Sequence, residues 1–289
     1  MTKGIDVSYC QRNVDWNKVK ESGIDFAIIR AGFGKYSPNQ IDSMFESHYA
    51  GATAANIHVG AYWYCYAKTV DQAKEEAEAC LKVIRDKKFD FPIFYDIEEK
   101  DTFNSGNISE IARTFCEILE DNGYFAGIYS FKSLLESYFS PEIRKRFCTW
   151  LAHWVESSSY SDPYDMHQYT DKGSVYGIQG YVDLNKCMTD FPQKIKDGGF
   201  NGYQKKGIPD KAPVRTVVDT VKKGDTGKYV ALAQMLLDLQ GFDVGKAGSD
   251  GKFGNDTEKA AKEFQKNNDL KSDGIIGPET WKVLIDITS

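Results

Sequence analysis

The chain has 289 residues, of which 41% are hydrophobic and 27% are charged, and its net charge is −6. This length and composition are typical of one large globular domain with room for a small second one. No apolar run is long enough to span a membrane, and the acidic balance argues against nucleic acid as a partner. We therefore expect neither a membrane nor nucleic acid among the partners of this chain.

Strand-like segments recur through the first two thirds of the sequence. Eight of them are found, at residues 4–8, 26–32, 59–67, 91–98, 125–130, 148–154, 165–169 and 181–184. Amphipathic helices are predicted over residues 72–88 and 107–122, whereas the later gaps between strands are short or polar. This order predicts an α/β fold, an irregular (β/α) barrel of eight strands with few helices in its second half.

The last third of the chain has a different character. Glycine, proline and charged residues dominate residues 196–216, which is typical of a linker. A glycine turn followed by a helix start then occurs twice, at residues 250–257 and 273–280. Helices are predicted at residues 228–239, 257–267 and 278–285. We therefore predict a main domain over residues 1–195, a linker over 196–216 and a small all-α domain over 217–289.

The fourth strand is an apolar, aromatic run that ends in two acids, Asp96 and Glu98. Alternate residues of a strand point to the same face, so the two carboxyl groups are expected to project together. Acids at the carboxyl end of a barrel strand usually serve catalysis. A neighbouring pair, one protonated and one charged, is also what glycoside hydrolysis needs. The alternative is that these acids form salt bridges or cap the next helix.

Two further acids are expected near this pair. Asp6 ends the first strand and Asp183 ends the last one. The first and last strands of a closed barrel are neighbours, so these acids would face Asp96 and Glu98 across one mouth. Four converging acids would raise the proton affinity of at least one of them, which favours a general acid. For Asp6 or Asp183 alone, capping a turn is the alternative.

Aromatic and polar side chains gather at the same strand ends. Sugar rings stack on aromatic faces, and tyrosine hydroxyl groups donate hydrogen bonds to sugars. For any single aromatic residue, packing in the core or at the rim is the alternative. The residues that we expect to bind substrate are Arg30, Tyr62, Tyr64, Tyr129, Trp154 and Gln168.

No signal for a metal or cofactor was found. The four histidines form no close ligand pair, and the chain has neither a phosphate-binding loop nor a nucleophile elbow. The six cysteines form no CxxC pair, so free thiols are expected. The sequence therefore predicts no metal and no cofactor.

Five short motifs, in chain order, resemble those of glycoside hydrolase family 25, the Chalaropsis-type muramidases. They are Gly4-Ile5-Asp6-Val7-Ser8, Arg30-Ala31-Gly32, Gly60-Ala61-Tyr62-Trp63-Tyr64, Tyr95-Asp96-Ile97-Glu98 and Tyr181-Val182-Asp183-Leu184-Asn185. The resemblance covers roughly residues 3–192. It implies an N-acetylmuramidase, or lysozyme, that cuts the β-1,4 bond between N-acetylmuramic acid and N-acetylglucosamine.

The same resemblance implies roles for the four acids. Glu98 resembles the general acid of the family, surrounded by Asp96, Asp6 and Asp183. Two roles for Asp96 stay open, direct attack as a nucleophile and orientation of the substrate's acetamido group for attack. A chitinase-like glycosidase and a non-catalytic wall-binding protein are the alternatives for the whole chain.

The tail, over residues of about 217–287, resembles a peptidoglycan-binding domain of the three-helix type. The matching signals are Gly224-Asp225, Leu236, Gly241-Phe242, the two glycine-turn copies, Phe264-Gln265 and Trp281. The resemblance implies bacterial peptidoglycan as the partner, and we expect a monomer that acts at the cell wall. A bacterial autolysin and a phage endolysin both fit. The N-terminus enters a strand without a signal peptide, which favours the endolysin or a processed chain.

Overall fold

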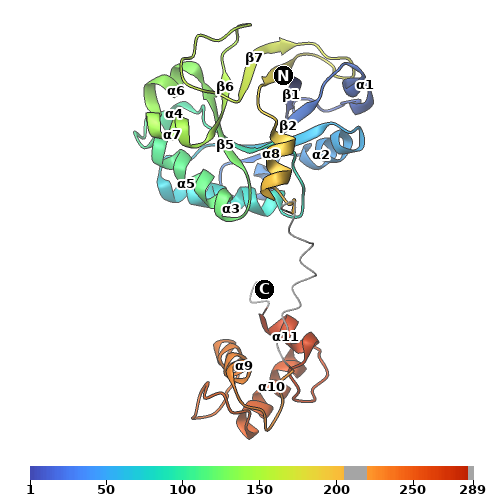
Figure 1. The fold of residues 1–289 in the computed structure, drawn as a ribbon, viewed down its shortest axis with the longest axis vertical. Helices are drawn as coiled ribbons and strands as arrows, with labels where there is room; N and C mark the ends of the chain where they lie inside the picture. The colour runs from blue at the N-terminus through green and yellow to red at the C-terminus, as the bar shows by residue number, and fades with distance from the viewer. Residues whose placement is uncertain (205–219, 286–289) are drawn as a thin grey trace. The chain divides into compact units, whose positions relative to one another are not determined.

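The computed structural model describes residues 1–204 and 220–285. The chain divides into two compact units, Met1–Ile208 and Pro209–Ser289. Figure 1 shows the first unit as a ring of strands with helices on its outside and the second as a small group of helices. Across the described ranges, no helix is both long and apolar enough to cross a membrane.

The first unit is a closed barrel in which the strands follow one another in chain order. The strands are β1 (Thr2–Val7), β2 (Phe26–Phe33), β3 (His58–Tyr64), β4 (Ile93–Asp96), β5 (Ala126–Phe131), β6 (Cys148–Ala152), β7 (Met166–Gly173) and β8 (Val182–Cys187). Neighbours from β1 to β7 are parallel, whereas β8 is antiparallel to both β7 and β1. The predicted irregular barrel of eight strands is confirmed.

Helices occupy the earlier connections of the barrel. They are α1 (Trp16–Glu21), the short 3-10 helix η1 (Pro38–Gln40), α2 (Phe45–Ala54), α3 (Val70–Ile84), α4 (Lys100–Phe103), α5 (Ile108–Asp121), α6 (Lys132–Tyr138) and α7 (Pro141–Arg146). α3 and α5 lie side by side on the outside of the barrel (Figure 1). Within residues 148–187, all of which are described, no helix joins β6 to β7 or β7 to β8. The short, polar connections in the sequence predicted few helices in this half of the barrel, in agreement with the structure.

α8 (Phe191–Gly198) seals one end of the barrel. The ring of Phe191 lies 5.5 Å from that of Phe91 and 5.8 Å from that of Phe125, which come just before β4 and β5. After the helix, the side chain of Asn201 accepts from the Phe125 amide at 2.7 Å and donates to the Phe91 carbonyl at 2.9 Å. The amino end of the barrel is therefore filled, and the carboxyl ends of the parallel strands form the open mouth.

This arrangement moves the end of the barrel past the predicted boundary at residue 195. That boundary falls inside α8, and the Tyr203 hydroxyl still donates to Asp90 at 2.8 Å. The glycines that suggested a linker instead end the helix, because Gly199 takes the left-handed conformation at φ 72°. We therefore place the end of the barrel after Tyr203. The rest of the predicted linker, residues 205–216, lies outside the described residues.

The second unit contains three helices among its described residues, as predicted. They are α9 (Lys228–Leu239), α10 (Asn255–Asn267) and α11 (Pro278–Ile285). Their shared core includes Leu237, Phe253, Phe264, Trp281 and Leu284. Trp281 and Leu284, three residues apart, lie on one face of α11 and pack against Leu237 of α9 and Phe264 of α10, so burial of these apolar side chains holds the three helices together.

A buried glutamine explains the internal repeat of the tail. Gln234 accepts from the Gly251 amide at 2.8 Å and donates to the Thr257 hydroxyl at 3.0 Å. Gln265 repeats this arrangement one helix later, with Gly274 at 2.8 Å and Thr280 at 3.1 Å. Each glutamine also donates to the aspartate of its own loop. The sequence repeat therefore corresponds to two copies of one hydrogen-bond arrangement, in which a glutamine binds a glycine loop to the preceding helix.

Candidate active site

Two of the predicted acids meet on neighbouring strands at the open mouth. Asp6, near the end of β1, pairs in register with Asp183 on β8. The prediction that Asp183 ends its strand is wrong, because it is the second residue of β8. Since β8 runs antiparallel to β1, its beginning lies beside the end of β1. The two acids therefore lie side by side, although the strand direction differs from a purely parallel barrel.

Two amide side chains hold the buried carboxylate of Asp6. Gln168 Nε2 donates to Asp6 Oδ2 at 3.0 Å, and Asn185 Nδ2 donates to the same oxygen at 2.8 Å. Gln168 and Asn185 are cross-strand partners on β7 and β8. Their positions are thus set by the sheet, and they fix Asp6 in one orientation at the mouth.

Aromatic donors in turn orient the two amides. Trp150 Nε1 donates to Asn185 Oδ1 at 2.7 Å, and Trp154 Nε1 donates to Gln168 Oε1 at 3.0 Å. The Tyr129 hydroxyl also donates to Gln168 Oε1, at 3.0 Å. An indole nitrogen can only donate. Each amide must therefore present its oxygen to the tryptophan and its NH₂ group to Asp6.

Asp96 and Glu98 lie at the end of β4. Asp96 is the last residue of the strand, is 5% exposed, and has a carboxylate oxygen, Oδ1, with no hydrogen-bond partner among the described residues. Ile97 is buried in the core between them and donates its amide to the Tyr129 carbonyl at 3.0 Å. This bond continues the ladder past the strand end. Glu98 is therefore on the same side as Asp96, as the alternation predicted.

Burial and neighbouring carboxylates raise the pKa of all four acids. Burial, then the charge of Asp183, and then that of Glu99 raise the pKa of Glu98 to about 7. Burial and the nearby Asp171 raise the pKa of Asp183 to about 6. The pKa values of Asp6 and Asp96 are also raised, first by burial and then by Asp183 and Glu98 respectively. The cluster therefore retains protons near neutral pH, as a general acid must.

A cavity of about 440 Å³ opens at the ends of the first three strands. Its lining residues are Tyr9, Arg30, Phe33, Asn39, Ile41, Asp42, Ser43, Tyr64 and Tyr66. Arg30 Nε donates to the buried Asp42 at 2.7 Å, and the guanidinium lies 4.7 Å from the centre of the Tyr9 ring. The Tyr64 hydroxyl donates to Glu99, the neighbour of Glu98, at 3.1 Å. The cavity is thus linked to the acid cluster and has aromatic walls suited to a sugar.

The other predicted binding residues lie at different depths. Trp154 is 47% exposed, whereas Tyr129 is only 5% exposed and contacts the cluster through Gln168. Tyr62 is half-buried against Trp150, with ring centres 6.1 Å apart. Trp154 can therefore meet a substrate at the surface, while Tyr129 holds other side chains in place.

Several residues of this mouth were not chosen as site residues from the sequence. They are Tyr9, Asp42, Tyr66, Trp150 and Asn185. Local signals existed for Tyr66, which alternates with Tyr62 and Tyr64, and for Asn185, which follows Asp183 by two residues and therefore shares its face of β8. Asp42 and Trp150 act through contacts with residues that are distant in sequence, which no local pattern reveals.

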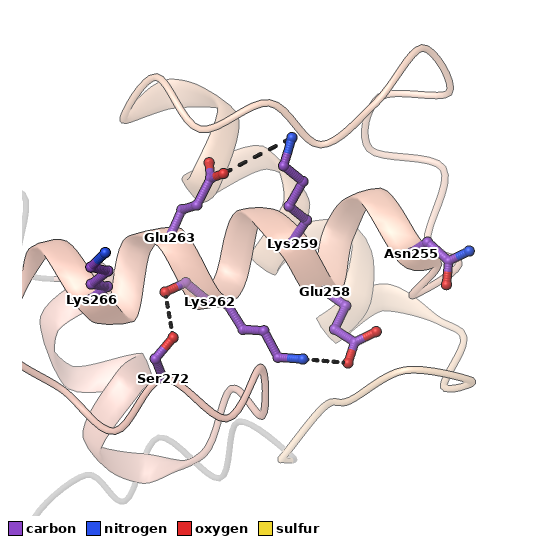
Figure 2. A pocket seen from close by; sticks show the side chains of 7 residues that line it. All are labelled: Asn255, Glu258, Lys259, Lys262, Glu263, Lys266 and Ser272. Atoms are coloured by element: carbon purple, nitrogen blue, oxygen red, sulfur yellow. Dashed lines mark hydrogen bonds and ion pairs between the residues drawn. The ribbon is translucent and has the colours of Figure 1, made fainter.

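The second unit has a groove of about 300 Å³ along α10 (Figure 2). Its acids are paired with lysines, Glu258 with Lys262 at 2.9 Å and Glu263 with Lys259 at 4.0 Å. The Ser272 hydroxyl donates to the Lys262 carbonyl at 2.9 Å and closes one side. Lysine–glutamate pairs four residues apart are typical of a solvated helix face. This groove therefore lacks the close, protonated acids found in the barrel.

Comparison with known proteins identifies the barrel. Residues 5–178 match the glycosyl hydrolases family 25 model. The chain belongs to this family. As a family 25 glycoside hydrolase, it also carries a match to a peptidoglycan binding domain at residues 226–284. The predicted family and the predicted type of tail are both confirmed.

Proteins similar to this family 25 chain include an autolytic lysozyme and an endolysin. It is 30% identical over 265 residues to the autolytic lysozyme of Clostridium acetobutylicum, covering 91% of this chain and 72% of that protein. The solved CTP1L endolysin superposes with a TM-score of 0.61 at 27% identity, covering 68% of this chain and 70% of that one. The tail is similar to part of the N-acetylmuramoyl-L-alanine amidase CwlL of Bacillus licheniformis, with 42% identity over 67 residues, which are 23% of this chain and 19% of that protein.

Proposed function

We propose that this protein is an N-acetylmuramidase, a lysozyme that hydrolyses the β-1,4 bond between N-acetylmuramic acid and N-acetylglucosamine in bacterial peptidoglycan. The observation that carries the proposal is the cluster of Asp6, Asp96, Glu98 and Asp183 at one barrel mouth. Family membership and the peptidoglycan-binding domain support the choice of substrate.

Glu98 is the proton donor in this proposal. A pKa of about 7 leaves much of its carboxyl protonated at neutral pH, so it can deliver a proton to the leaving oxygen of the glycosidic bond. Burial is the main cause of the raised pKa, because it disfavours the charged form of the carboxyl group. The role needs no partner beyond the acids already present in the mouth.

Asp96 supplies the second carboxyl group of the reaction. Its Oδ1 atom is buried and has no partner among the described residues, so its capacity for a hydrogen bond is unused. We propose that this oxygen stabilises the positive charge that builds up at the anomeric carbon, either by bonding to it or by orienting the acetamido group of the sugar. Asp6, held by Gln168 and Asn185, and Asp183 tune the charge around this centre.

The remaining parts serve substrate binding. The aromatic cavity beside the cluster takes part of the glycan strand, with Arg30 and Tyr64 in its wall. The tail holds the barrel close to an insoluble substrate and so raises the effective concentration of cleavable bonds. We propose that the enzyme acts outside the cell membrane, at the wall. It would act there as a monomer, because one chain supplies the whole acid cluster.

The experiment that tests this proposal compares two insoluble polymers. Purified peptidoglycan should lose turbidity when the enzyme is added, while chitin should release no new reducing ends. Release from chitin but not from peptidoglycan would favour a chitinase-like glycosidase. Tight binding to cell walls with no loss of turbidity would instead indicate a wall-binding protein without catalysis.

A further inference from the structure

One wall of the aromatic cavity depends on a residue that follows β3. Tyr66 is 47% exposed, and its ring lies 5.1 Å from that of Tyr64 and 5.9 Å from that of Phe33. On either side, the Cys65 amide donates to the Asp96 carbonyl at 2.9 Å and the Lys68 amide donates to Gln72 at 2.7 Å. The segment between these two bonds carries the Tyr66 ring into the cavity wall.

The backbone of Tyr66 is held by a buried acid on the helix behind it. Glu76, on α3, is 3% exposed and accepts from the Tyr66 amide through Oε1 at 3.0 Å. Its other oxygen, Oε2, accepts from the Tyr95 hydroxyl at 2.7 Å. The thiol of Cys65 donates to that hydroxyl at 3.0 Å. Glu76 therefore joins α3, the segment after β3 and the residue before Asp96.

A buried carboxyl group without a cationic partner among the described residues, such as that of Glu76, is unusual on a helix that only covers the outside of a barrel. No lysine or arginine in the described part of the chain forms an ion pair with Glu76, and burial raises its pKa to about 7. A buried acid without a cation is costly unless its oxygens meet donors in fixed positions. Glu76 meets such donors on both oxygens, the Tyr66 amide on Oε1 and the Tyr95 hydroxyl on Oε2, and the Ala67 amide and the Cys65 thiol add further hydrogen bonding. Its geometry therefore fits a role in placing those donors.

We propose that Glu76 is a positioning residue for the substrate cleft, because its carboxylate fixes the Tyr66 backbone and thereby the ring that forms one cavity wall. The inference rests on the proposed glycan-cleaving function of the same mouth. Glu76 lies outside the lining of the cavity but, through Tyr66, sets the affinity of the cavity for substrate. The proton-transfer step at Glu98 is not affected by it.

The first test is the near-isosteric substitution Glu76→Gln, assayed on soluble peptidoglycan fragments at pH 8, where most of the Glu76 carboxyl is ionised because its pKa is about 7. The amide oxygen still reaches one donor, but the charge that strengthens both bonds is lost, so KM should rise about five-fold while kcat stays within about two-fold. Glu75→Gln is the matched control, since Glu75 is the exposed neighbour on α3 and should leave both constants unchanged. An unchanged KM in folded Glu76→Gln overturns the proposal. So does a fall in kcat alone, which would mean that Glu76 acts on Asp96 through Tyr95.

A double-mutant cycle with Tyr66→Ala separates positioning from general stability. If Glu76 acts through the Tyr66 ring, Glu76→Gln should raise KM no further once that ring is absent. Additive effects on KM would overturn the proposal. Hydrogen exchange at the Tyr66 amide provides a readout that needs no activity. It should speed up in Glu76→Gln, and an unchanged rate would refute the proposal even if the wild-type enzyme cleaved a different glycan.

Discussion

Neutralising Asp183 should change the pH range in which the enzyme works. After burial, the charge of Asp183 is the next largest cause of the raised pKa of Glu98. Because the pKa of Asp183 itself is about 6, this charge is present when Glu98 titrates near pH 7. Asp183→Asn removes it but leaves Glu98 buried. The pKa of Glu98 should therefore fall by roughly 0.5–1 unit, not to its ordinary value.

The assay is the pH dependence of kcat/KM on soluble peptidoglycan fragments. The alkaline limb reports the loss of the proton from the general acid, so it should move to lower pH in Asp183→Asn. At pH 8, activity relative to each enzyme's own maximum should then be about three- to ten-fold lower than in the wild type. The control is Asp121→Asn, an exposed acid at the end of α5, which should leave the limb in place. An alkaline limb at the wild-type pH in Asp183→Asn would refute the proposed charge coupling.

Three further changes test the proton donor, the tail and its internal repeat. Glu98→Gln should lower turnover by about 10²–10⁴-fold while wall binding and thermal stability stay near wild type, because only the transferable proton is lost. Deleting residues 205–289 should weaken pelleting with cell walls more than cleavage of soluble fragments, because the barrel ends after Tyr203. Gln265→Ala should destabilise the tail by about 3 kcal/mol in thermal unfolding, since it leaves the Gly274 amide unpaired.

Each of these three predictions has an outcome that would contradict it. Near wild-type turnover in Glu98→Gln would remove this residue from the role of general acid. Equal losses on walls and on soluble fragments after the deletion would make the tail part of the catalytic unit. For the repeat, Lys266→Ala on the exposed face of α10 is the control, and a similar loss of stability in both variants would show that Gln265 is not special.

The parts of the site that could be predicted are those that depend on short patterns of neighbouring residues. Asp96 and Glu98 follow an apolar run, and alternation alone places them on one side of β4. Reasoning from strand ends correctly placed Asp183 beside Asp6. It was wrong about the direction of β8, because Asp183 lies at the beginning of that strand and not at its end. A clue was present, because a parallel crossover needs about a dozen residues or more and the connection from β7 to β8 is shorter.

Other features depend on contacts that no local pattern contains. The two amide side chains that bind Asp6 are far from it in the sequence. Gln168 follows Asp6 by 162 positions, and Asn185 follows it by 179 positions. The end of the barrel was misjudged because a helix terminus and a linker share glycine-rich composition, and only the contacts of Asn201 and Tyr203 distinguish them. Glu76 did leave a signal. It is a charged residue on the face of α3 that buries Ala73 and Cys80, where a solvated acid would not be expected.

The most direct test of the account is chemical identification of the new ends in digested peptidoglycan. Purified peptidoglycan would be treated with the enzyme, reduced with borohydride, and the products identified by mass spectrometry. A muramidase that acts through Glu98 and Asp96 should leave reduced N-acetylmuramic acid at the new ends, and Glu98→Gln should leave almost none. Reduced N-acetylglucosamine would instead indicate a glucosaminidase, and the absence of new reducing ends would contradict glycoside hydrolysis altogether.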